Sequence, residues 1–276
     1  MQCAGFDRLS LSLSKAPLQT MPHRPPRILS IAGSDSSGGA GIQADIKTIT
    51  MLGGYAMTAV TALTAQNTLG VARVDPVAPE MVLAQIEACL ADIGVDAVKI
   101  GMLGSAAIAQ QVAERLAGLA CPVVFDPVMV ATSGAVLADS DTIAAFERLM
   151  ALATLTTPNV AELAALGGDQ AMAERRIAYL AKGGDAGGDE VVDRLVVPGE
   201  PAREWRAPRI GSGDFHGTGC TLSSAIATLL GAGHSLEDAV GGGRRFVRAA
   251  LEAAPGFGAG AQPLGHAQVR DQVARP

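Results

Sequence analysis

Apolar residues occur in short continuous runs that alternate with stretches of helical spacing. A short apolar run that ends at glycine, proline or a charged residue is typical of a strand buried on both faces. Such runs predict strands at residues 27–33, 55–63, 96–101, 122–126 and 153–157. The segments between them place apolar side chains three and four positions apart, as one face of a helix does. They predict helices at residues 42–52, 79–92, 106–119, 143–152, 221–230 and 236–254.

Strands that alternate with helices in this way predict an α/β fold with a mostly parallel central sheet and helices on both faces. We expect a single domain over residues 27–254. Residues 1–26 contain serine, proline and mixed charge without periodicity, so they are predicted to be a disordered extension. Residues 255–276 are rich in glycine and proline, which favours a loose C-terminal tail.

Composition excludes several classes of protein. Of 276 residues, 49% are apolar, which supports a sizeable core and excludes intrinsic disorder. A net charge of −6 and few aromatic residues (six Phe, two Tyr, one Trp) argue against a nucleic-acid partner. The chain contains no run of about 18 apolar residues, so no membrane-spanning helix is predicted. The four cysteines form no Cys-x-x-Cys pair, which argues against a zinc site or a disulfide framework and favours the cytoplasm.

A loop rich in glycine and serine, residues 33–41, follows the first predicted strand. Ligands of α/β sheets bind where strands end. Residues 39–44 match the dinucleotide pattern G-x-G-x-x-A, but no acidic residue stands about twenty positions on, which weighs against a dinucleotide site. Two interpretations remain open, a flexible turn and a loop whose backbone approaches a small ligand.

Residues 211–221 give the sharpest chemical signal. Glycines directly before a helix let backbone N–H groups converge near the positive end of the helix dipole, where an anionic phosphoryl oxygen would be stabilised. The phosphate-loop pattern G-x-x-x-x-G-K-[ST] is absent from the chain. The alternative is a helix cap with packing glycines.

Four polar residues lie at ends of predicted elements. Asn159 and Glu162 share one helix face and would suit Mg²⁺ held through waters, although simple N-capping by Asn159 is the better interpretation of the pair alone. Asp126 ends a buried strand, where a carboxylate needs a cation or a donor. Lys182 could face phosphates, although a lone lysine is usually only solvated.

Six ordered segments together resemble the ribokinase-like superfamily, and more narrowly the hydroxymethylpyrimidine/phosphomethylpyrimidine kinases. The segments are residues 32–47, 61–67, 99–103, 126–129, 157–162 and 216–221. The resemblance spans roughly residues 27–252 and implies a three-layer ribokinase-like fold. It also implies two phosphoryl transfers from ATP in thiamin biosynthesis, first to 4-amino-5-hydroxymethyl-2-methylpyrimidine and then to its monophosphate.

The resemblance implies a role for each matching residue. Gly33, Gln66 and Met102 would line the pyrimidine pocket, with Gln66 on the polar edge of the ring, and Asp45 belongs to the same substrate-binding signature. The family's anion hole corresponds to Gly217, Thr218, Gly219 and Cys220. Asp126, Asn159 and Lys182 would contact ATP, and Glu162 with Asp126 would organise Mg²⁺.

Cys220 stands where most sugar kinases of the superfamily have a catalytic aspartate. The second acceptor is a phosphate that is already ionised, so it needs no base and an aspartate would repel it. We therefore expect Cys220 to act mainly through local geometry and as a weak base in the first step. Its position at a helix N-terminus favours a lowered pKa.

One departure from the family lies at residues 163–180, where a sheet strand is expected to be shortened or missing. That change puts ATP binding and the role of Lys182 in doubt. Three functions therefore stay open: the bifunctional pyrimidine kinase, a pyridoxal kinase, and a pyrimidine-binding homologue with impaired catalysis. The family further implies a homodimer.

Overall fold

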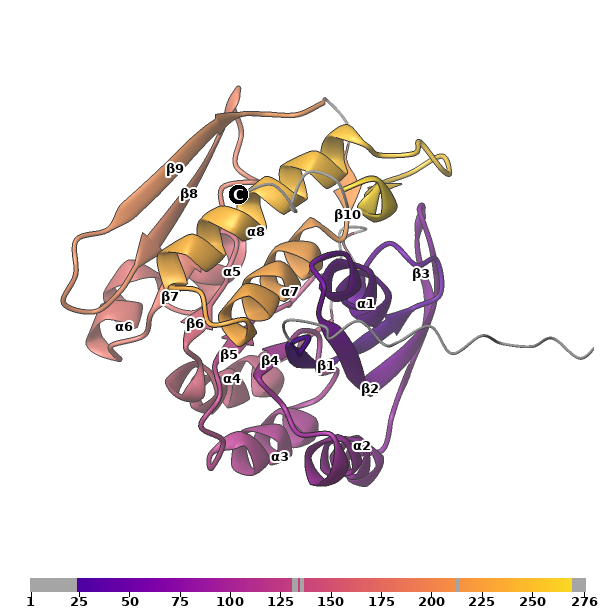
Figure 1. Cartoon of the computed structure of the whole chain (residues 1–276), viewed down its shortest axis with the longest axis vertical. Coiled ribbons are helices and arrows are strands. Elements are labelled where there is room, and N and C mark those ends of the chain that lie inside the picture. The colour runs from indigo at the N-terminus through magenta and orange to yellow at the C-terminus, as the bar shows by residue number, and fades with distance from the viewer. Residues whose placement is uncertain (1–23, 131–133, 135–136, 212–213, 270–276) are drawn as a thin grey trace, which may run out of the picture.

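A central sheet lies between two layers of helices (Figure 1). The computed structural model describes residues 24–130, 134, 137–211 and 214–269. Of the predicted disordered extension, residues 1–26, the first 23 residues lie outside the described part of the chain. In the part of the chain that is described, the main sheet has nine strands in the order β3-β2-β1-β4-β5-β6-β7-β8-β9. The predicted three-layer α/β fold is confirmed.

The elements follow one another along the chain in α/β alternation. The strands are β1 (Arg27–Asp35), β2 (Tyr55–Asn67), β3 (Gly70–Pro76), β4 (Ala97–Ile100), β5 (Val123–Phe125), β6 (Leu155–Thr156), β7 (Tyr179–Ala181), β8 (Glu190–Val196), β9 (Arg203–Pro208), β10 (Phe215–His216) and β11 (Gln262–Pro263). The helices are α1 (Gly41–Met51), α2 (Pro79–Asp92), α3 (Ala106–Leu116), α4 (Ser140–Leu152), α5 (Val160–Ala165), α6 (Gly168–Glu174), α7 (Thr218–Gly231) and α8 (Leu236–Glu252), with a short 3-10 turn at His266–Gln268.

The middle of the sheet is parallel. Strands β2, β1, β4, β5, β6 and β7 run in the same direction, while β3, β8 and β9 are antiparallel to their neighbours. The register places Ile31 beside Ile100, and Ile100 beside Phe125. The carboxyl ends of the parallel strands therefore meet along one edge of the fold, where a ligand site is expected.

Each face of the sheet has its own apolar core. Side chains of α2, α3 and α4 pack with Ile31, Val98 and Phe125 on one face. Residues of α7 and α8 pack with Ile28 and Val124 on the other, where Figure 1 shows α1, α7 and α8 side by side. The continuous apolar strands follow from this arrangement, because successive side chains enter opposite cores.

The sequence did not predict the antiparallel strands β3, β8 and β9 at the two edges of the sheet. β3 exposes most of its residues and β9 alternates exposed with half-buried ones, so neither has the continuous apolar run of a central strand. The strand expected to be shortened or missing within residues 163–180 is present as the short β7, which pairs with both β6 and β8. The sheet therefore has no gap at this place.

The C-terminal segment is only partly as predicted. The expectation of a loose tail over residues 255–276 is wrong for residues 262–269, because β11 pairs with β10 and three side chains are buried. These are Leu264, His266 and Val269. Residues 270–276 lie outside the described residues.

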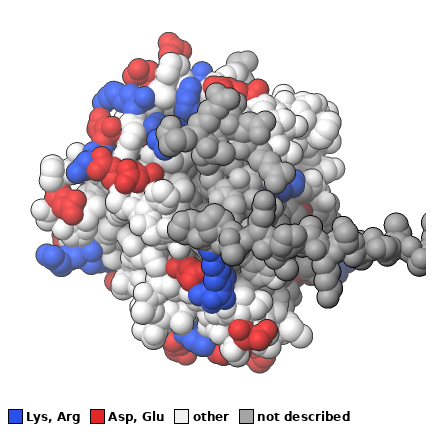
Figure 2. All heavy atoms as spheres, in the orientation of Figure 1, with Lys and Arg blue, Asp and Glu red and all other residues white. Residues whose placement is uncertain are grey.

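Charged side chains of both signs lie close together on the drawn surface (Figure 2). Arg206 pairs with Glu190 and Glu204, and Arg203 pairs with Glu237. Such mixing produces no extended field of one sign near β8 and β9. None of the helices in the described part of the chain has both the length and the apolar character that a membrane span requires.

Candidate functional site

A cavity of about 870 Å³ lies at the carboxyl ends of the parallel strands. It is lined by the last residues of β1 and β2 and by residues that follow β4, β5, β6 and β7. Of the predicted site residues, it brings together Gly33, Gln66, Met102, Asp126, Asn159, Glu162, Lys182 and the four residues 217–220. The predicted residues thus share one space because the parallel strands all end at the same edge.

One end of the cavity is formed by Gly33, Met102 and Gln66. A side chain at position 33 would overlap the methyl group of Met102, so this glycine lets the Met102 side chain lie against the end of β1. The Thr61 hydroxyl donates to the Met102 carbonyl at 2.6 Å and fixes the backbone there. This end combines apolar walls with a few polar side chains, which is the usual composition of a pocket for a small heterocycle.

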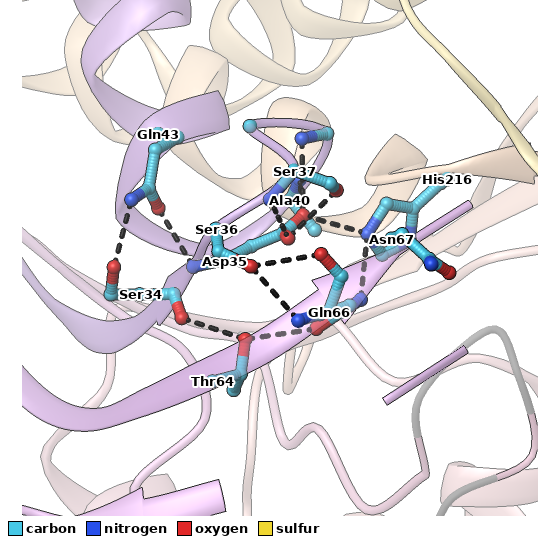
Figure 3. A network of polar contacts seen from close by, with 12 residues as sticks. Ser34, Asp35, Ser36, Ser37, Ala40, Gln43, Thr64, Gln66, Asn67 and His216 are labelled. Carbon is cyan, nitrogen blue, oxygen red and sulfur yellow. Dashed lines mark hydrogen bonds and ion pairs between the residues drawn. The ribbon is translucent and has the colours of Figure 1, made fainter. Parts of the chain in front are cut away.

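Asp35 and His216 are polar residues of this end that the sequence did not predict (Figure 3). Asp35 accepts hydrogen bonds from the backbone of Ser37, Gly39 and Ala40 at 2.8 to 3.0 Å, and its Oδ2 lies 2.8 Å from Nε2 of His216. Burial would raise the pKa of Asp35, but the bonds from His216, Ser37 and the backbone outweigh it and lower the pKa to about 2. Asp35 is therefore a carboxylate at neutral pH, and the loop of residues 36–40 between β1 and α1 folds around it.

The glycine turn before α7 lies beside this network. Gly217 has φ of +88°, and a Cβ there would overlap the carbonyl oxygen of Gly39, so only glycine fits. Helix α7 begins at Thr218, three residues before the predicted start at residue 221. Residues 218–220 therefore form its first turn, whose N–H groups have no acceptor within the helix. This geometry suits an anion, as predicted from the glycines.

Cys220 does not have the lowered pKa that its place at a helix N-terminus favoured. Burial raises the pKa of the thiol to about 11, and Asp45 and Asp126 add to the rise, while Lys99 opposes it. The helix terminus is outweighed because burial disfavours the charged thiolate and two carboxylates lie near it. At neutral pH Cys220 is therefore a thiol.

Lys182, Asp126 and Glu162 form a charged cluster opposite the glycine turn. The Lys182 Nζ lies 2.7 Å from Asp126 Oδ1 and 3.8 Å from Glu162 Oε2. Burial alone would lower the pKa of Lys182, but the two carboxylates raise it, so the ammonium stays charged. A Cβ at Gly219 would lie 3.1 Å from that nitrogen, which places the cation directly against the turn.

The carboxylates of this cluster fit a Mg²⁺ ion that is held mostly by water and phosphate. Within the described residues, no group of three or more His, Cys, Asp or Glu side chains could hold a metal by itself. One or two carboxylates with substrate phosphates are the usual set for Mg²⁺, and Asp126 and Glu162 provide two. Burial raises the pKa of Glu162, with Asp126 adding to the rise and Lys182 opposing it.

Asn159 caps helix α5, which confirms the structural interpretation of the Asn159–Glu162 pair. The Asn159 side chain accepts from the backbone N–H of Glu162, and the Glu162 side chain accepts from that of Asn159, both at 2.8 Å. The same capping box holds Glu162 beside Lys182. The cap and a role toward ATP are compatible, because Asn159 still lines the cavity.

Asp45 is not a cavity residue, contrary to the prediction that it binds substrate. Its side chain is fully buried and forms an ion pair with Lys99 at 2.9 and 3.0 Å. Ser30 and Ser224 donate to the same carboxylate at 2.6 and 2.7 Å. Burial would lower the pKa of Lys99, but Asp45 and its neighbours raise it, so the pair is ionic. Asp45 therefore ties β1, β4 and α7 together behind Cys220.

The family is decided by a comparison with known proteins. A model of the family described as phosphomethylpyrimidine kinase matches residues 35–265. This chain belongs to that family. Hydroxymethylpyrimidine/phosphomethylpyrimidine kinase of Streptomyces coelicolor is 44% identical over 261 residues, which cover 90% of this chain and 96% of the relative. The enzyme of the same name from Rhizobium meliloti is 44% identical over 255 residues, with 86% and 96% covered.

Solved structures of phosphomethylpyrimidine kinase and of pyridoxal kinase share the fold. An ADP complex of Bacillus subtilis pyridoxal kinase has a TM-score of 0.79 at 32% identity and covers 90% of this chain and 99% of its own. Phosphomethylpyrimidine kinase of Clostridium difficile 630 has a TM-score of 0.68 at 36% identity, with 81% and 98% covered. The resemblance in the sequence is thus confirmed at the level of the family.

Proposed function

We propose that this protein transfers phosphate from ATP to 4-amino-5-hydroxymethyl-2-methylpyrimidine and then to the monophosphate, in thiamin biosynthesis. One observation carries the proposal: a single cavity joins the end formed by Gln66 and Met102 to the glycine turn before α7 and to Lys182. An acceptor held at the first place and a phosphate chain at the second would meet at residues 217–220. Membership of the phosphomethylpyrimidine kinase family supports the choice of substrate.

Different residues of the cavity would have different roles in phosphoryl transfer. Gly33, Met102 and Gln66 would hold the pyrimidine ring. The N–H groups of residues 217–220 would stabilise the negative charge of the transferred group, which is the main requirement of a loose transition state. Lys182 would bind phosphate oxygens with its ammonium, which leaves Asp126 and Glu162 to hold Mg²⁺. The metal, when bound, neutralises phosphate charge and orients the transferred group.

The two acceptors differ in what they need from Cys220. The hydroxymethyl oxygen loses a proton as it attacks, and Cys220 would take it only in its thiolate form. The monophosphate is ionised at neutral pH because its second pKa is about 6. A neutral thiol tolerates that dianion where a carboxylate would repel it.

A pyridoxal kinase remains the second candidate, because the pyridoxal kinase structure has the higher TM-score of the two structures described above. The third possibility, a binding protein with impaired catalysis, loses its structural basis. It depended on a defect at residues 163–180, but β7 is present and places Lys182 directly after its end, 2.7 Å from Asp126.

The test is ADP release from purified protein with Mg-ATP and either the pyrimidine alcohol or pyridoxal as the acceptor, with the product identified by mass. Two added phosphates support the proposal, and phosphorylation of pyridoxal alone would overturn it. Lys182→Met is the matched control, since we expect it to lose turnover but keep pyrimidine binding in calorimetry. Binding without turnover by the unmodified protein would favour the third possibility.

We further propose that the protein works as a cytoplasmic homodimer. The hairpin β2–β3 lies at the edge of the sheet and exposes the apolar side chains of Leu63, Leu69 and Val74. An exposed edge strand with apolar side chains is a favourable surface for a second copy. Light scattering after gel filtration tests this, with Leu63→Lys expected to give a monomer.

A further inference from the structure

The amide of Gln66 lies between the His216 ring and the Thr64 hydroxyl (Figure 3). The other hydrogen bonds of these two groups indicate whether each can donate to the amide or accept from it. One end of the amide lies 2.9 Å from Nε2 of His216, and the other lies 3.3 Å from Oγ1 of Thr64. The two ends of an amide have the same shape and differ only in hydrogen bonding, so the partners decide which end is oxygen and which is NH₂.

On the His216 side the partner is a donor. Nε2 of His216 lies 2.8 Å from Asp35 Oδ2, and Asp35 is ionised because its pKa is about 2. A carboxylate only accepts, so Nε2 carries a hydrogen. That nitrogen then has no lone pair that could accept from an NH₂ group. Only the amide oxygen, as a second acceptor of the same N–H, is compatible with it.

On the Thr64 side the partner is an acceptor. The Thr64 hydroxyl has a single hydrogen and lies closer to the carbonyl oxygen of Ser34, at 3.0 Å, than to the Gln66 amide, at 3.3 Å, so we assign the hydrogen to Ser34. Towards Gln66 it offers a lone pair, which calls for the NH₂ group. The two neighbours, on different sides of the amide, thus require the same orientation.

We propose that Asp35, His216 and Thr64 are positioning residues that hold the Gln66 amide with its oxygen toward His216 and its NH₂ toward Thr64, and so determine which pyrimidines are accepted. The second lone pair of the oxygen and the second N–H then remain for the ligand, in a fixed donor–acceptor order. A 4-aminopyrimidine edge, with a donor amino group beside an acceptor nitrogen, complements this order. A 4-oxopyrimidine, which presents an acceptor beside an N–H, does not.

Hydrogen bonds and close packing surround Asp35 and His216. Backbone N–H groups of the loop after β1 hold Asp35, and a Cβ at Gly39 would lie 2.5 Å from Cδ2 of His216, so this glycine admits the ring. His216 directly precedes Gly217 of the anion-binding turn. The same imidazole therefore connects the recognition of the ring with the place of phosphoryl transfer.

The test compares the variant Thr64→Val with its matched control Thr64→Ser, which keeps the hydroxyl. The measured quantity is the ratio of kcat/KM for the 4-amino alcohol to that for its 4-oxo analogue. Valine removes the acceptor of the NH₂ group and leaves His216 alone to orient the amide. We therefore expect the ratio to fall by about tenfold while KM for ATP stays within twofold. Serine should restore the ratio. An equal loss for both analogues would mean a merely structural role and would overturn the proposal.

This inference rests on the proposed function, because the assay uses its substrate. A second measurement distinguishes failure of this inference from failure of the proposed function. In the NMR spectrum of the ligand-free protein, NH₂ protons of Gln66 should show contacts to the methyl group of Thr64 and none to the His216 ring. The reverse pattern would overturn the fixed orientation whatever the substrate. Failure of the unmodified protein to phosphorylate either pyrimidine, with the NMR pattern as expected, would count against the proposed function alone.

Discussion

The raised pKa of Cys220 predicts that the two phosphoryl transfers depend differently on pH. With a pKa of about 11, the thiolate fraction at pH 7 is on the order of one in ten thousand. If that thiolate takes the proton from the hydroxymethyl oxygen, kcat/KM of the first step should rise about tenfold for each pH unit, and so about a hundredfold from pH 7 to pH 9. The parameter kcat/KM is the appropriate one, because it reports ionisations of the free enzyme.

The second step has no proton to remove from its acceptor, so its kcat/KM should change less than threefold over the same range. The assay follows each step separately, with the alcohol or the monophosphate as the only acceptor and saturating Mg-ATP. Cys220→Ala should remove the slope of the first step and leave the second step largely unchanged. Cys220→Ser is the matched control of similar size, and its first step should also lose the slope below pH 9.

Two results would refute this reasoning. A first step whose rate rises no more than that of the second would mean that no thiolate takes part. A slope that survives in Cys220→Ala would mean that another group accepts the proton. In either case Cys220 would act through packing at the start of α7, where its small size leaves room for the second acceptor.

Three further predictions concern the framework of the site. Gly217→Ala should lower kcat by about a hundredfold or more, measured with both acceptors, because a Cβ would overlap the Gly39 carbonyl and displace the anion-binding turn. Burial lowers the pKa of His266 to about 4, so the neutral ring is favoured in the folded state, and up to about 3 kcal/mol of stability should be lost as pH falls from 6.5 to 4. Urea unfolding of His266→Gln should lack this dependence, and an unchanged dependence would contradict the assignment. Lys99→Met should cost about 3 to 5 kcal/mol in the same assay by leaving the Asp45 carboxylate buried without its cation, and adding Asp45→Asn should recover part of that loss.

The positions of the predicted site residues could be inferred because they depend on local signals. Asp126, Asn159 and the glycines before α7 stand directly after an apolar run or before a helix, and the carboxyl ends of parallel strands share one edge. Gly33, Gln66 and Met102 were placed in the site by the resemblance to the family. The capping box of Asn159 and the glycine turn at Gly217 are likewise local. Strands β3, β8 and β9 were missed, because the edge strands β3 and β9 bury little and lack a continuous apolar run.

The chemistry of the site residues could not be inferred in the same way, since it depends on neighbours that are distant in the chain. The pKa of Cys220 is set by burial and by Asp45, Asp126 and Lys99, none of which is near it in sequence. Asp45 was assigned to substrate because it lies in the glycine-rich signature, yet Lys99 and Ser224 pair with it from other elements.

Asp35 and His216 show why recognition of the ring was the hardest part to predict. They are 181 residues apart and meet only when the loop after β1 and the start of α7 close on the same cavity. Asp35 fixes the hydrogen on His216, and that hydrogen in turn selects the orientation of the Gln66 amide. The polar pattern offered to a pyrimidine is therefore a property of the assembled loops and not of the glutamine alone. A homologue that keeps the glutamine but changes the residue at position 35, 64 or 216 is expected to accept a different ring.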